Sequence, residues 1–141
     1  MNRLKIIFFL ACTIVAMVGC LDNTGSDPEP ITEPMGISYY YIVNQSGLDL
    51  NVTYEIAFSD IDSTVAVSAD STTKIFEEGG IGGLFPPSHV LTKLSFYKSS
   101  DDSTSPILTI APVVNENWNL TAGEVDNVAK YELVLSTEDL K

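Results

Sequence analysis

The chain has 141 residues, 45% of them hydrophobic, and its 19 Asp and Glu residues outnumber 7 Lys and Arg residues, so the formal net charge is −12. This balance argues against nucleic acid as a partner, because such binding depends on clustered Lys and Arg, and against direct adhesion to an anionic bilayer. The length suits one domain with one hydrophobic core.

The first twenty residues have the layout of an export signal. Arg3 and Lys5 precede an almost wholly apolar run over residues 6–18, and Gly19 places a small residue before Cys20. The run is too short to cross a bilayer as a helix, which takes about 20 residues. The pattern therefore predicts a signal that is cleaved after Gly19. An ordinary signal with an incidental cysteine and an uncleaved anchor are the alternatives.

The end of this signal resembles a known motif. Met17-Val18-Gly19-Cys20 is similar to the lipobox of bacterial lipoproteins, with Met17 in the place usually held by Leu. The resemblance implies that Cys20 is acylated with at least a diacylglyceryl group and becomes the mature N-terminus. Two or more acyl chains anchor stably, at ~0.8 kcal/mol per buried CH₂. We therefore expect a protein of the bacterial cell envelope, anchored in the membrane by lipid, and Leu21 favours the outer over the inner membrane.

Composition divides the chain into three parts. Residues 1–19 are the expected signal peptide, residues 20–35 the lipidated cysteine and an acidic tether with three prolines, and residues 36–141 the folded domain. The tether cannot bury enough apolar surface to offset the entropy of ordering, so we expect it to be disordered. Because Cys12 would leave with the signal and Cys20 would carry lipid, the domain must hold together without a disulfide.

Period-two patterns dominate the first half of the domain. Over residues 48–58, six apolar side chains alternate with the others, which predicts a half-buried strand. Residues 37–43 are rich in strand formers, and the turn residues 44–47 between the two segments predict a hairpin. Strands at residues 64–69 and 72–77 are predicted to pair through the turn that separates them.

Four more predicted strands complete the domain. They lie at residues 89–98, 107–111, 116–121 and 128–136, and a helical turn is expected at residues 136–140. Seven or eight short strands with turns between them predict an all-β fold, namely an antiparallel β-sandwich with Greek-key connections. A closed β-barrel is the alternative.

A glycine-rich loop covers residues 79–88. It lacks the Gly-Lys-Ser/Thr of a phosphate-binding loop, and a strand rather than a helix is expected after it. In one interpretation its apolar tip of Ile81, Leu84 and Phe85 contacts a partner or ligand. In the other, which we favour, the loop crosses between sheets and its apolar side chains cap the core.

The sequence offers little support for catalysis. His89 is the only histidine and follows Ser88, but no Gly-x-Ser-x-Gly elbow is present, and the His/Cys clusters of zinc or iron sites are missing. Calcium could use Asp60 and Asp62, the pair at residues 101–102 or the segment at residues 22–27, although acidic turns explain these residues and no complete calcium loop is present. We therefore predict no catalytic residue, no metal site and no cofactor.

Aromatic side chains could bind a sugar by stacking. The candidate ligand contacts are Tyr40, Phe85 and Trp118. Alternation places Tyr39 and Tyr41 on one face of their strand and Tyr40 on the other. Because aromatic residues are also ordinary core material, glycan binding is an alternative rather than the leading hypothesis.

The tripeptide Asp-Ser-Thr occurs three times, in each case where a turn is expected. It resembles the O-glycosylation acceptor motif of Bacteroidota, which would make Ser63, Ser71 and Ser103 the acceptors, although Asp and Ser favour turns in any case. Signal, cysteine, tether and β-domain together resemble the small lipoproteins of Bacteroidota. The leading hypothesis is a non-enzymatic cell-envelope lipoprotein whose β-sandwich associates with an envelope protein or has a structural role. The alternative is a glycan- or calcium-binding module on a membrane tether.

Overall fold

The computed structural model describes residues 35–60, 62–100, 104–122 and 127–141. The chain divides into two units, Met1–Thr32 and Glu33–Lys141, and the description below concerns the second. The predicted signal peptide, Cys20 and nearly all of the tether lie outside the described residues. Within the described part of the chain, no helix is both long and apolar enough to cross a membrane.

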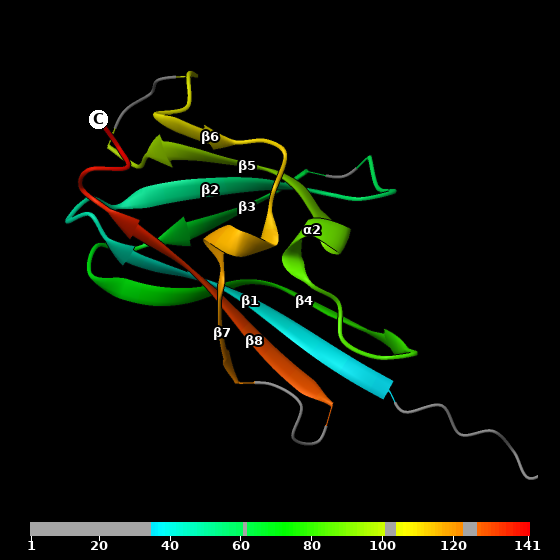
Figure 1. The fold of residues 1–141 in the computed structure, drawn as a ribbon. Coiled ribbons are helices and arrows are strands. Elements are labelled where there is room, and N and C mark those ends of the chain that lie inside the picture. The colour runs from blue at the N-terminus through cyan, green and yellow to red at the C-terminus, as the bar shows by residue number, and fades with distance from the viewer. Residues whose placement is uncertain (1–34, 61, 101–103, 123–126) are drawn as a thin grey trace, which may run out of the picture. The chain divides into compact units, whose positions relative to one another are not determined.

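Eight strands and two short helical segments make up the described domain (Figure 1). The 3-10 turn η1 and the four-residue helix α2 lie in connections between strands. The elements are β1 (Met35–Gln45), β2 (Leu50–Ile56), β3 (Asp62–Val67), β4 (Ser71–Ile81), α2 (Pro87–Val90), β5 (Leu91–Lys98), β6 (Leu108–Ile110), η1 (Asn115–Asn117), β7 (Asn119–Ala122) and β8 (Val128–Ser136).

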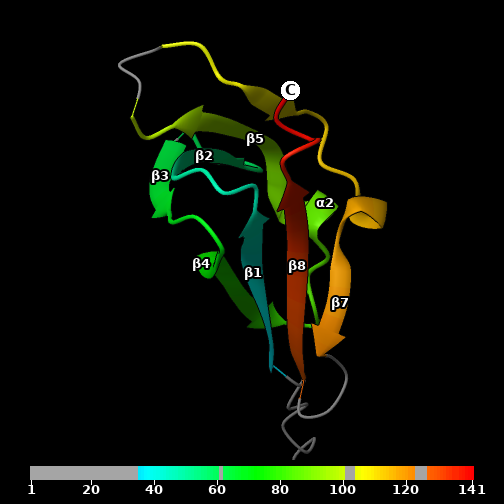
Figure 2. The same cartoon turned by 90° about the vertical axis from the view of Figure 1, so that its left-hand side faces the viewer.

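The strands form two four-stranded sheets. Sheet A has the order β4-β1-β8-β7, and sheet B has the order β3-β2-β5-β6. Figure 2 shows the four strands of sheet A side by side in this order. The sheets are mainly antiparallel and do not close into a barrel, so the predicted all-β sandwich is confirmed over the barrel alternative.

The pairing of neighbouring strands differs from the sequence prediction in three places. β1 and β2 are not a hairpin, because β1 belongs to sheet A and β2 to sheet B. β3 and β4 also lie in different sheets, so the predicted pairing through the turn at Asp70 was wrong. In addition, β1 runs parallel to β8, with Ile37 opposite Val128. The chain therefore crosses between the sheets where short turns suggested hairpins.

A buried asparagine explains the two crossings at one end of the sandwich. The side-chain nitrogen of Asn44 donates hydrogen bonds to the carbonyl oxygens of Leu48 (2.7 Å) and Ser68 (3.0 Å). Its side-chain oxygen accepts hydrogen bonds from the backbone nitrogen and the hydroxyl of Ser46. Asn44 is fully buried, so these bonds satisfy a polar group that would otherwise be costly inside the protein. They tie the β1–β2 and β3–β4 connections together.

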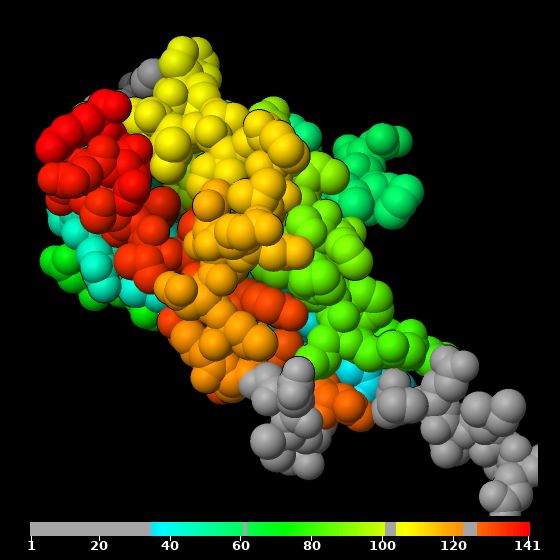
Figure 3. Space-filling model, in the orientation of Figure 1, coloured from blue at the N-terminus to red at the C-terminus, as the bar shows by residue number. Residues whose placement is uncertain are grey.

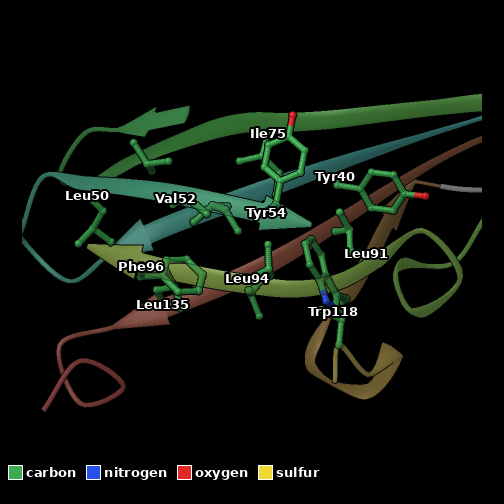
Figure 4. Close-up of a cluster of buried hydrophobic side chains, with 14 of the residues drawn as sticks. Tyr40, Leu50, Val52, Tyr54, Ile75, Leu91, Leu94, Phe96, Trp118 and Leu135 are labelled. Carbon is green, nitrogen blue, oxygen red and sulfur yellow. The ribbon is translucent and has the colours of Figure 1, made fainter. Parts of the chain in front are cut away.

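The core lies between the inner faces of the two sheets (Figure 4). Its members come from strands of both sheets, from α2 and from the segment between β6 and β7, and on the strands their burial follows the alternation of the sequence. Each large apolar side chain removed from water contributes roughly 1.5–3 kcal/mol. The largest fully buried apolar or aromatic side chains are Tyr40, Phe96, Ile42, Leu50, Leu91, Leu94 and Leu135.

Strand boundaries shift modestly from the predicted ones. β2 is confined to Leu50–Ile56, because Phe58 turns the chain with a φ of 63° and is fully exposed. The predicted strand at residues 89–98 begins only at Leu91, after α2. At the C-terminus the expected turn is present, and the carboxylate of Asp139 accepts hydrogen bonds from the backbone nitrogen and hydroxyl of Ser136. These bonds lower the pKa of Asp139.

Candidate functional site

The outer face of sheet A, turned away from the core, is the surface most suited to association. On β1 the buried residues alternate with outward-facing ones, as predicted, so Tyr39 and Tyr41 point outward while Tyr40 points inward. Apolar residues remain exposed at both ends of this face: Met35 (67%) and Ile81 (68%) at one end, Val134 (38%) at the other. Several exposed apolar residues on one face are typical of protein-binding surfaces. A single exposed apolar residue, in contrast, is common on any protein.

Strand register fixes which residues are neighbours on this face. Ile81 lies opposite Met35, and Val43 lies opposite Val134. Between these apolar ends, two rows each place a tyrosine of β1 between one residue of β4 and one of β8. Read in that order, the rows are Glu77–Tyr39–Lys130 and Lys74–Tyr41–Glu132.

A β-bulge brings two of these charges to the same face. β4 has one extra residue, Ile75, between the partners of Tyr40 and Tyr41. Ile75 is buried, and Lys74 and Glu77 on either side of the bulge both lie on the outer face, where they form an ion pair. The hydrogen bond from Lys74 to Glu77 raises the pKa of the lysine. The ammonium of Lys74 also lies 5.3 Å from the ring centroid of Tyr39.

The three aromatic residues predicted as ligand contacts meet, but in the interior. The rings of Tyr40 and Trp118 pack edge to face with centroids 6.1 Å apart, and the Tyr40 hydroxyl donates a hydrogen bond to the carbonyl oxygen of Phe85 at 2.7 Å. Tyr40 is fully buried and Trp118 only 7% exposed, so neither offers a free ring face to a sugar. Figure 4 shows Tyr40 and Trp118 pointing into the core near Leu91.

Burial of the Tyr40 ring has an electrostatic consequence. The ring stacks with Phe76 and with Tyr131, at centroid distances of 6.1 and 5.8 Å. This burial raises the pKa of the Tyr40 phenol far above its ordinary value of about 10, and the nearby Ser38 hydroxyl offsets the rise only in part. The phenol is therefore a neutral hydrogen-bond donor within the core.

The predicted glycine loop was only partly right, because residues 79–81 belong to β4 and residues 87–88 to α2, and the segment between them is held against β1. The hydroxyl of Ser38 accepts a hydrogen bond from the backbone nitrogen of Phe85 at 2.9 Å, which adds to the bond from Tyr40. Gly36 and Gly83 touch so closely that a Cβ at Gly36 would lie 2.1 Å from the Gly83 carbonyl oxygen. Phe85 packs against the core, as the capping interpretation predicted, whereas Ile81 stays exposed on the outer face of sheet A.

The predicted glycosylation sites fall in different surroundings. Ser63 lies within the edge strand β3 rather than in a turn, and it is partly buried opposite Tyr54. Ser71 opens β4, and its hydroxyl donates a hydrogen bond to the carbonyl oxygen of Ser68 at 2.7 Å. Ser103 lies outside the described residues. Of the two described hydroxyls, that of Ser71 is therefore already used to close its turn.

Of the residues considered for catalysis or for a metal site, Asp101, Asp102 and the segment at residues 22–27 lie outside the described residues. Ser88 and His89 belong to α2, where the backbone nitrogen of Ser88 donates a hydrogen bond to the side chain of Asn115 at 2.9 Å. This bond links α2 to η1, which lie against each other in Figure 3 as green and orange surfaces. Among the described residues, no group of three or more His, Cys, Asp or Glu side chains is placed to hold a metal ion.

One surface hollow of about 340 Å³ lies at the end of the sandwich near the β1–β2 connection. Its lining includes Gly47, Asp49, Lys98 and Ser99. The Asp49 carboxylate already accepts a hydrogen bond from the backbone nitrogen of Ala69 at 2.8 Å, and the Asp49 carbonyl accepts one from Ser99 at 2.9 Å. These polar groups hold connections of the sandwich in place.

Comparison with known proteins identifies no relative of this chain. A scan against protein-family models and searches of the curated proteins and of the solved structures each gave no match.

The charged residues of the outer face were missed by sequence reasoning. Alternation in the last strand was a usable signal for Lys130 and Glu132, because it places both on the face opposite Leu133. Lys74 and Glu77 carried no such signal, since strict alternation puts positions three apart on opposite faces. Only the bulge at Ile75 brings them together.

Proposed function

We propose that the chain is a non-enzymatic lipoprotein of the bacterial cell envelope, anchored by lipid on Cys20, whose sandwich associates with a protein through the outer face of sheet A. The observation that carries the association is the set of exposed apolar side chains, Met35, Ile81 and Val134, on the same face as Tyr39 and Tyr41. Tyrosine and methionine are enriched in protein interfaces, and tyrosine is frequent among their energetically dominant residues.

Anchoring follows from the residues before the domain. The apolar run, Gly19 and Cys20 support lipid attachment, and the acidic, proline-containing segment after them supports a spacer between membrane and sandwich. The strongly negative chain would not adhere to an anionic bilayer unaided, so the lipid supplies the attachment and the domain surface is left for a partner.

The glycan alternative has less support. Its best candidates, Tyr40 and Trp118, are committed to the core, and sugar stacking needs an open ring face. Protein association requires only the exposed surface described above, so it is the function that the geometry supports best.

The association is tested with a photo-crosslinking amino acid in the full-length chain in its own cells. Placed at Tyr39, on the outer face of sheet A, it should give adducts of defined mass. Placed at Thr53, on the outer face of sheet B, it should give none. Equal adducts at both positions, or adducts at neither, would contradict a specific surface on sheet A.

A further inference from the structure

We infer that the partner of the outer face of sheet A is a second copy of the same chain, related to the first by a twofold axis in the plane of the contact. This inference rests on the proposed function of that face. A surface that binds its own copy in this way must be complementary to itself. The arrangement of charge on this face meets that condition.

The four charges form a checkerboard around the two outward tyrosines. On β4 the order along the strand is Lys74 then Glu77, and on β8, in the same rows, it is Glu132 then Lys130. Like charges therefore occupy the diagonals. Strand and residue spacings place the Cα atoms at the corners of a rectangle of roughly 10 Å by 7 Å.

Two twofold axes in the plane of such a checkerboard, one along the strands and one across them, would bring opposite charges of the two copies face to face. With the axis along the strands, Glu77 of one copy faces Lys130 of the other, and Lys74 faces Glu132. With the axis across the strands, Glu77 faces Lys74 and Lys130 faces Glu132. Facing sheets pack at about −30°, which displaces each corner by only about 3 Å, within reach of these long side chains.

The face also differs from the rest of the protein in charge. It carries two of the five lysines of residues 36–141 and two glutamates in the central rows, so these rows are neutral in a chain of net charge −12. Two such acidic chains repel each other over most orientations. Contact through these rows replaces that repulsion with four ion pairs, which selects this orientation over others.

The apolar ends supply contact area on both sides of the charges. The rows from Met35 to Val43 span about 27 Å along β1, and three strands span about 14 Å across. This patch is smaller than the ~800 Å² per partner of a standard interface, so the dimer is weak in dilute solution. A lipid anchor confines both copies to one surface and raises their effective concentration.

The test uses two differently tagged copies of the full-length chain, coexpressed, each with a photo-crosslinking amino acid at Tyr39, crosslinked in the membrane and only then solubilised in excess detergent. One tag is captured and the other is quantified. Wild-type copies should be captured together. Lys130→Glu in both copies should lower the yield by roughly tenfold, because twofold symmetry turns two of the four ion pairs into contacts between like charges.

Lys93→Glu is the matched control. Lys93 is a partly exposed lysine on sheet B that forms an ion pair with Glu55 at 2.7 Å, so its reversal makes the same change in net charge on the other sheet. Its yield should equal that of wild type. Two chains that meet only by chance in the membrane would respond alike to Lys130→Glu and Lys93→Glu, and that result would overturn the dimer.

Mixed pairs of variants identify the axis. Lys130→Glu in one copy should be rescued by Glu77→Lys in the other if the axis runs along the strands, and by Glu132→Lys if it runs across them. Rescue also shows that the variants fold. Failure of both rescues, or no joint capture of wild-type copies, would overturn the inference. Crosslinks from Tyr39 to a different protein would then leave the proposed function standing without the dimer.

Discussion

The hydroxyl of Tyr40 donates a hydrogen bond to the carbonyl oxygen of Phe85 across 2.7 Å, and this joins an inner strand of sheet A to the loop that leads to sheet B. The donor is fully buried and the two residues are 45 positions apart in the chain. Together with the bond from Phe85 to Ser38, it fixes both backbone groups of Phe85.

Tyr40→Phe should therefore destabilise the fold while leaving the aromatic packing intact. It removes the donor to a partly buried carbonyl oxygen, which costs ~1–3 kcal/mol in free energy of unfolding. Urea unfolding measures the difference. Tyr39→Phe, one position away on the outer face, should change stability by less than about 0.5 kcal/mol. Equal losses for the two variants would show that the Tyr40 hydroxyl has no special role.

The same phenol predicts how stability responds to alkaline pH. In the unfolded chain Tyr40 loses its proton near pH 10, whereas burial raises its pKa in the folded state. The contribution of the protonated Tyr40 to the free energy of unfolding is complete below about pH 10. As the pH rises above 10 the free energy of unfolding falls, because unfolding then releases a proton. Thermal unfolding at increasing pH should show this fall in the wild type and a shallower one in Tyr40→Phe. Identical slopes would contradict the prediction.

Gly36→Ala should be among the most damaging single substitutions in sheet A. The added Cβ would lie 2.1 Å from the backbone oxygen of Gly83, and backbone cannot move aside as a flexible side chain can. We expect a loss of roughly 1–3 kcal/mol in urea unfolding. Gly79→Ala is the control, because its Cβ would meet its nearest neighbour at an ordinary 3.5 Å. A tolerated Gly36→Ala would show that the loop does not rest on β1.

The proposed lipid attachment makes a prediction for the cysteines. Cys20→Ser should abolish incorporation of labelled fatty acid and move the protein to the aqueous phase of a detergent partition, because no acyl chain then remains to bury in the membrane. Cys12→Ser should leave both properties unchanged, since that residue lies within the predicted signal. Mass spectrometry of the N-terminal peptide gives the direct reading, and an unmodified thiol at Cys20 would contradict the anchor.

Alternation in the sequence was enough to predict most of the strands. In residues 37–43 it put Tyr40 on the face opposite Tyr39 and Tyr41, but it did not tell which face is inward, and Tyr40 is fully buried. It could not predict the partner of each strand, because a strand has the same pattern whether the next one pairs with it or crosses to the other sheet. That choice depends on Asn44, whose buried hydrogen bonds reach two separate connections.

The candidate surface was only partly predictable for a related reason. Period two places Tyr39 and Tyr41 on one face of β1, but their charged neighbours on β4 depend on one inserted residue, Ile75. The aromatic residues chosen as ligand contacts do converge, yet convergence alone does not distinguish a binding site from a core. Exposure decides it, and Trp118, which lies just before β7, is buried in a cluster that includes side chains of both sheets.

The parallel pairing of β1 with β8 joins the first strand of the domain to the last, with Ile37 opposite Val128. Both edges of β1 can therefore be paired only after the final strand of the domain, β8, has been synthesised. Contacts so distant along the chain slow folding, because the intervening loop must close first. Sheet A is thus completed only after synthesis reaches residue 136, and a chain that ends before β8 would leave one edge of β1 unpaired.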